Sequence, residues 1–264
     1  MTDAVPGFDR TTFAHAGWEH EVYRAGAGPA VIVIHEVPGL HPGVIAFGQR
    51  LVDAGYRVYL PSLFGRPGAP PTGGEVLRVL PRVCVSREFT VLANRASPVA
   101  TWLRALAAQA HAECGGPGVG AVGMCFTGGF ALAMAVEPAV LAPVLSQPGL
   151  PAPVTARNRA GIGLDPADLA VVRQRTHDGL CVLGLRFSAD RGSPPERFAT
   201  LRRELGDAFE GIEIDSSPGN PHGIRKAAHS VLTVELVDKP GHPTRAALDR
   251  VLAFLAERLY PAGV

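Results

Sequence analysis

The 264-residue sequence has almost no excess charge and no extended run of basic residues. Its formal net charge is +1, and Lys and Arg occur consecutively only in pairs such as Arg202-Arg203. A protein that binds nucleic acid or an anionic membrane usually carries a basic patch or stripe, and this sequence shows none. We therefore expect a small-molecule partner, no nucleic acid and no membrane, while the oligomeric state stays open.

Long hydrophobic runs are also missing. Residues 1–15 lack the basic segment followed by an apolar segment that is typical of a secretory signal. Further along, Glu137, Pro138 and Pro143 interrupt the apolar stretches before they reach the length of a membrane span. These features predict a soluble, cytoplasmic protein.

Cysteine is scarce, and its spacing follows no ligand pattern. The sequence contains neither CxxC nor a Cys/His spacing of the kind found in zinc sites, and the cysteines lie too far apart to suggest a dense disulfide framework. We predict no metal site and no cofactor. The four cysteines are Cys84, Cys114, Cys125 and Cys181.

Strand and helix patterns alternate along the chain, and a hydrophobic content of 47% allows a substantial core. We predict an α/β fold with a doubly wound, mostly parallel sheet, helices on both faces, and one domain over 1–264 with its core at about 28–260. Residues 65–82, rich in Pro and Gly, are expected to form a long loop. Strands are expected at 30–36, 57–64, 118–124, 139–147, 180–190 and 209–217, and helices at 42–55, 101–113, 193–206 and 243–260.

The segment 118–136 has the layout of a nucleophile elbow, in which an apolar strand enters a tight turn and a glycine-opened helix follows. Cys125 occupies the position of the nucleophile. The positive end of the helix dipole favours the thiolate form of a cysteine there. A buried structural cysteine is the alternative interpretation. The small residues that such a turn requires are Gly123, Thr127, Gly128 and Gly129.

Partners for Cys125 are expected at the carboxyl ends of later strands, in the order acid and then histidine. Asp190 ends the strand at 180–190 and is the candidate acid, with an ordinary polar turn residue as the alternative. Two histidines follow the strand at 209–217. We favour His229 as the base, and His222 remains the alternative.

The first buried strand is followed by Glu36, for which an ordinary exposed loop acid would be the preferred interpretation if the elbow were absent. At that strand end the backbone N–H of Val37 could join that of Phe126 to form an oxyanion hole. Two such donors would stabilise the negative oxygen of a tetrahedral intermediate.

Together these motifs resemble the dienelactone hydrolase family of the α/β-hydrolase fold. The similarity covers about residues 28–260 and includes VIVIHEVPGL, LVDAGYRVYLPSLFGR and the elbow GMCFTGG. The sequence departs from the family pattern at His35, where glutamine is usual, at Thr127, where glycine is usual, and in the length of 148–178.

The resemblance implies a triad of Cys125, His229 or His222, and Asp190. It also implies that Glu36 interacts with the nucleophile and helps to switch the thiol to the thiolate when substrate binds, and that Arg87 and Arg225 bind a substrate carboxylate. The expected activity is hydrolysis of a carboxylic ester, a lactone or enol ester in particular, through a thioester. A redox-responsive cysteine protein and a ligand-binding scaffold without turnover remain as alternatives.

Overall fold

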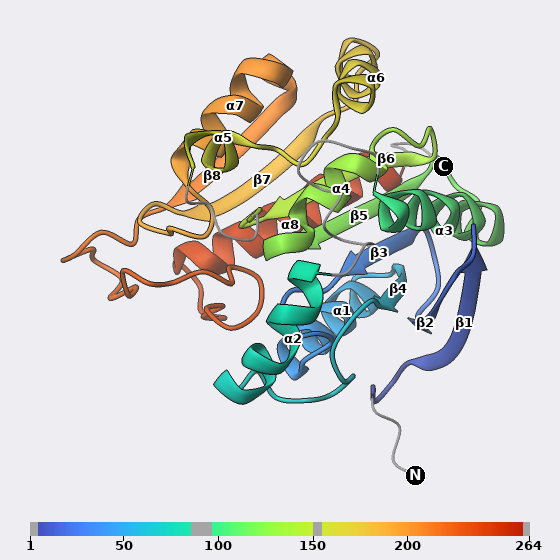
Figure 1. Ribbon diagram of the computed structural model, residues 1–264, viewed down its shortest axis with the longest axis horizontal. Coiled ribbons are helices and arrows are strands. Elements are labelled where there is room, and N and C mark those ends of the chain that lie inside the picture. The colour runs from blue at the N-terminus through green and yellow to red at the C-terminus, as the bar shows by residue number, and fades with distance from the viewer. Residues whose placement is uncertain (1–4, 86–96, 150–154, 261–264) are drawn as a thin grey trace.

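The computed structural model describes residues 5–85, 97–149 and 155–260, and these residues contain one eight-stranded sheet. The strand order is β1-β2-β4-β3-β5-β6-β7-β8 (Figure 1). An antiparallel hairpin, β1–β2, is attached to one edge of six parallel strands. The strands are β1 (Asp9–His15), β2 (Trp18–Ala25), β3 (Ala30–Ile34), β4 (Arg57–Ser62), β5 (Val119–Met124), β6 (Val140–Ser146), β7 (Val182–Phe187) and β8 (Phe209–Ile214).

Helices cover both faces of this sheet (Figure 1). One face packs against α1 and α8, and the other against α3 and α4. The helices of the described residues are α1 (Pro42–Asp53), α2 (Gly73–Val85), α3 (Pro98–Cys114), α4 (Gly128–Met134), α5 (Ala156–Ala160), α6 (Pro166–His177), α7 (Pro195–Leu205) and α8 (Pro243–Leu259). None of them is long and apolar enough to cross a membrane.

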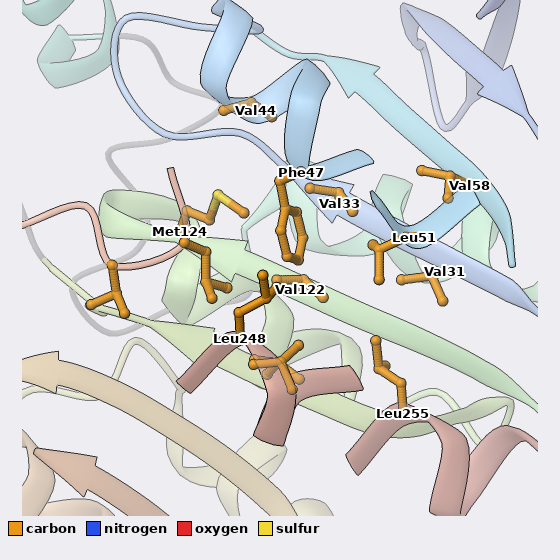
Figure 2. Close-up of a cluster of buried hydrophobic side chains, with 14 of the residues drawn as sticks. Val31, Val33, Val44, Phe47, Leu51, Val58, Val122, Met124, Leu248 and Leu255 are labelled. Atoms are coloured by element: carbon orange, nitrogen blue, oxygen red, sulfur yellow. The ribbon is translucent and has the colours of Figure 1, made fainter. Parts of the chain in front are cut away.

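The alternation of side chains along β3 explains why the strand is apolar at every position. Val31 and Val33 join the cluster formed with α1 and α8, whereas Ile32 and Ile34 join the cluster formed with α3. In the first cluster Phe47 of α1 lies near Val33 (Figure 2). Because both faces are buried, an all-apolar strand is required in the middle of the sheet.

The predicted fold class is confirmed, and two local predictions need correction. The expected loop over 65–82 ends earlier, because α2 begins at Gly73. Pro67, Pro70 and Pro71 all precede that helix, and the Thr72 hydroxyl accepts a hydrogen bond from the Glu75 N–H at 3.4 Å. Three of the prolines therefore lie in the approach to a helix, whereas Gly73, Gly74 and Pro81 lie within it. The hairpin β1–β2 was outside the predicted core.

Candidate active site

Cys125 lies at the turn between β5 and α4, in the backbone conformation that a nucleophile elbow requires. Its φ is +55°, a left-handed conformation that is unusual for a residue with a side chain. Gly123 makes the turn possible, because a Cβ there would lie 2.3 Å from the Thr127 carbonyl oxygen. The Cys125 side chain is partly exposed.

Thr127, which stands where the family has glycine, ties the elbow to the neighbouring strand. Its hydroxyl accepts from the Met124 N–H at 2.9 Å and lies 2.9 Å from the Ile34 carbonyl, to which it can donate. The substitution therefore adds contacts between the elbow and the end of β3.

His229 and Asp190 meet beside the elbow. His229 Nδ1 lies 2.7 Å from Asp190 Oδ2, and the other carboxylate oxygen accepts from the Gly192 N–H at 2.8 Å. The Cys125 side chain lies close enough to the His229 ring for a thiolate there to raise the pKa of the imidazole. The structure thus brings together Cys125, His229 and Asp190.

The charges around His229 strongly favour its protonated form. Burial alone would lower its pKa, but the negative charge of a Cys125 thiolate and the hydrogen bond to Asp190 outweigh burial and raise the pKa to about 11. An imidazolium beside a thiolate is the pairing that activates a cysteine nucleophile.

The loop that carries Asp190 is held by a buried arginine of β7. Arg186 donates from Nε to the Ser193 carbonyl at 2.8 Å and from Nη2 to the Ser188 carbonyl at 3.0 Å. Its Nη1 pairs with Glu213 of β8. Arg186 was not predicted as a site residue, although an arginine inside an otherwise apolar strand indicates a buried polar contact.

Glu36 follows β3 and is almost completely buried. Its carboxylate takes part in four side-chain hydrogen bonds, and the Cys125 sulfur is not among the described partners. The interaction with the nucleophile that the family resemblance implies concerns the substrate-bound state and stays a prediction. The partners are His41 Nε2 at 3.1 Å, Gln147 Nε2 at 3.1 Å, Ser230 Oγ at 2.7 Å and Thr233 Oγ1.

These hydrogen bonds keep Glu36 ionised despite its burial. Burial alone would raise the pKa of the carboxyl group, but the bonds from His41, Thr233 and Ser230 hold the pKa below its usual value. The His41 Nδ1 accepts from the Gly43 N–H at 3.1 Å, so the ring proton is on Nε2 and is donated to Glu36.

Val37 and Phe126, the proposed oxyanion donors, follow two strands that pair directly. Ile34 of β3 is the partner of Gly123 of β5, and each proposed donor lies three residues beyond its member of that pair. Both side chains pack into the same apolar cluster. The register of the sheet therefore places the backbone segments that contain Val37 and Phe126 at the same end of the sheet.

The remaining predicted site residues lie elsewhere or outside the described residues. The His222 ring faces His242, with a centroid distance of 5.4 Å, in an exposed loop. Arg225 forms an ion pair with Glu235. Arg87 lies outside the described residues.

A second buried arginine, Arg197 of α7, supports the wall of the site. Its Nη1 and Nη2 donate to the carbonyls of Pro148 and Asn158, both at 2.7 Å. Burial lowers its pKa to about 10, and the charges of Cys125 and Asp190 partly oppose that change. The segment it holds reaches the elbow, where the Gly149 N–H donates to the Cys125 carbonyl at 2.8 Å. Arg197 was not among the site residues predicted from the sequence.

A metal site does not emerge from the described residues. They contain no group of three or more His, Cys, Asp or Glu side chains arranged to hold an ion.

The parallel sheet, the elbow and the order of the site residues define an α/β hydrolase. The model of the dienelactone hydrolase family matches residues 21–163, more than half of the chain, and the protein belongs to that family. It is an ester hydrolase. A search of curated proteins found no match.

Solved structures of related hydrolases share the fold at low sequence identity. A dienelactone hydrolase-type protein from Klebsiella pneumoniae is 19% identical with a TM-score of 0.62, covering 95% of this chain and 98% of its own. A dienelactone hydrolase from Anabaena variabilis is 16% identical with a TM-score of 0.61, covering 97% and 99%. Esterase 2 of Thermogutta terrifontis is 15% identical with a TM-score of 0.58, covering 97% of each chain.

Proposed function

We propose that the protein hydrolyses a lactone or enol ester through a thioester on Cys125. The observation that carries this proposal is the His229 ring, which hydrogen-bonds to Asp190 through Nδ1 and lies close enough to Cys125 for the sulfur's charge to act on it. The partly exposed sulfur at a strained turn supports the same role, because a nucleophile must reach a bound carbonyl.

In the first half of the reaction, the Cys125 thiolate attacks the ester carbonyl carbon. The carbonyl oxygen becomes an oxyanion, which the backbone N–H groups of Phe126 and Val37 stabilise. Collapse of this intermediate breaks the bond to the leaving oxygen. The His229 imidazolium gives its proton to that oxygen, and a thioester remains on Cys125.

In the second half, neutral His229 removes a proton from water as the water attacks the thioester. Cleavage of the carbon–sulfur bond releases the carboxylic acid and restores the thiolate–imidazolium pair. Asp190 keeps the ring oriented and stabilises its positive charge throughout.

The nucleophile limits the substrate class. A thiolate is a good leaving group, so the tetrahedral intermediate expels it again unless the other leaving group is at least as good. An enolate meets this condition better than an ordinary alkoxide or an amine. Esters with an enol leaving group, including enol lactones, are therefore the expected substrates, and amides are not.

The test is rapid mixing of the wild-type protein and Cys125→Ala with p-nitrophenyl acetate and with a small enol lactone. We expect the wild type to give a burst of p-nitrophenolate followed by turnover, and Cys125→Ala to give neither. Cys181→Ala is the matched control, because Cys181 precedes β7 at the strand end opposite Asp190, and it should behave like the wild type.

Other outcomes of the experiment would identify the alternatives. Turnover that survives in Cys125→Ala would exclude the cysteine mechanism. A wild type without turnover that binds the enol lactone would indicate a ligand-binding scaffold. A protein inert to both esters whose Cys125 is rapidly oxidised by peroxide would indicate a redox-responsive role.

A further inference from the structure

We infer that Glu36 is a positioning residue, which fixes the loop carrying His229 by accepting hydrogen bonds from Ser230 and Thr233. This inference rests on the proposed function, because it assigns His229 as the base. It gives Glu36 a different task from direct action on the Cys125 thiol.

The contacts of Glu36 connect three separate parts of the chain. Glu36 itself follows β3, Gln147 follows β6, and Ser230 and Thr233 belong to the loop between β8 and α8. Gln147 also accepts from the Val231 N–H at 3.2 Å, so it contacts the same loop. The buried carboxylate therefore joins the histidine loop to the carboxyl ends of two central strands.

The position of Ser230 in the sequence makes this connection effective. It directly follows His229, and its hydroxyl lies 2.7 Å from Glu36 Oε2. Asp190 orients the His229 ring, whereas the bond from Ser230 restrains the backbone that carries the ring. On either side of these residues, the loop is anchored by apolar contacts of Ala228 and Val231 in the core.

The carboxylate has little remaining capacity to act on the sulfur. Two carboxylate oxygens offer about four acceptor positions, and four donors already occupy them. His41 is one of these donors in its neutral form, because its Nδ1 accepts from the Gly43 N–H. The negative charge of Glu36 is thus stabilised by four donors, two of which, Ser230 and Thr233, belong to the loop that it positions.

The test is a double-mutant cycle with Glu36→Gln and Ser230→Ala, together with Thr233→Val. Each single variant should lower kcat, by roughly 10-fold to 100-fold for Glu36→Gln, because small misplacement of a catalytic group has effects of this size. KM should change much less. The double variant Glu36→Gln/Ser230→Ala should be about as impaired as Glu36→Gln alone, because both remove one connection.

Glu235→Gln is the matched control, since Glu235 is a carboxylate in the same loop that pairs with Arg225 and does not contact His229. Its kcat should equal that of the wild type. If Glu36→Gln fails to fold, Ser230→Ala and Thr233→Val each remove one donor and test the same connection.

Alkylation of Cys125 by iodoacetamide separates the two roles of Glu36. Positioning predicts that Ser230→Ala and Thr233→Val shift the pH profile of alkylation in the same direction as Glu36→Gln. Direct action on the thiol predicts a shift in Glu36→Gln alone. That second pattern, or additive losses in the cycle, would overturn the inference.

A measurement without substrate distinguishes failure of this inference from failure of the proposed function. The proton between His229 Nδ1 and Asp190 should give a low-field NMR signal in the wild type and in Glu235→Gln, and a broadened or lost signal in Ser230→Ala. If the wild type hydrolyses no ester but this pattern holds, only the proposed function fails. An unchanged signal in Ser230→Ala would overturn the positioning role.

Discussion

At the scale of single residues, His35 links the ends of two neighbouring strands in its neutral form. Its Nε2 accepts from the Leu63 N–H at 3.0 Å, and its Nδ1 donates to the Glu36 carbonyl at 3.1 Å. Burial lowers its pKa from 6.5 to about 4. The glutamine that the family usually has at this position also offers one donor and one acceptor, which explains how histidine can replace it.

This pKa predicts how the stability contribution of His35 depends on pH. Below pH 6.5 the unfolded chain binds a proton at His35 that the folded protein does not bind until about pH 4, so acid favours unfolding. At about 1.4 kcal/mol per pH unit, the loss amounts to about 3 kcal/mol over this interval. Above pH 6.5 the contribution should be constant.

Urea unfolding of the wild type and His35→Gln at several pH values measures this effect. As the pH falls from 6.5 to 4, the unfolding free energy of the wild type should decrease relative to that of His35→Gln. A difference that stays constant over that interval would contradict a neutral, buried His35.

The sequence allowed the choice of Cys125, Asp190 and His229 as candidates, because elbow and strand-end positions follow from local patterns. The contacts of Glu36 could not be predicted in this way. Its partners Ser230 and Thr233 are almost two hundred positions away, and no local pattern relates them to the end of β3. Long-range polar contacts of this kind appear only when the loops are placed in space.

At the scale of elements, the passage from β5 into α4 depends on the absence of a side chain at Gly123. We expect Gly123→Ala to reduce the unfolding free energy by about 1–3 kcal/mol, because its Cβ would approach the Thr127 carbonyl oxygen to 2.3 Å. Activity should fall as well, since relief of the clash moves the turn that carries Cys125.

Gly73→Ala is the control for this substitution. Gly73 begins α2, and a Cβ there would meet no atom within 4 Å. Its unfolding free energy should remain within about 0.5 kcal/mol of the wild type. Equal stability of the two variants in urea titrations would contradict the close approach at the elbow.

Elements were predictable where their pattern was periodic and local. The buried strands and α8 were expected close to their observed positions. Helix α7, expected over 193–206, begins at Pro195 with Pro194 at its N-cap position. Helix α2 was missed because Gly and Pro dominate the stretch before it.

At the scale of the whole molecule, we expect the chain to unfold as one domain. A single sheet runs through the described residues, and the cluster on one face includes residues from β2 to α8. Thermal unfolding followed by far-UV circular dichroism and by fluorescence of Trp18 and Trp102 should give the same midpoint. Two separated transitions would show that the chain contains two units.

The α/β architecture was predictable because alternation of buried strands and helices permits few topologies. The antiparallel hairpin at its edge was not predictable in the same way. Its strands are partly exposed, with polar residues at most positions of β1, so they lack the apolar runs that identify the central strands.

The strand order leaves β1 and β8 at the two borders of the sheet, where backbone groups could pair with another molecule. Both border strands carry charges held in ion pairs. Arg10 of β1 pairs with Glu21, and Glu210 of β8 pairs with Arg250. Joining two copies border to border would bring these charged side chains together and strip them of water, which disfavours edge-to-edge pairing of the sheet.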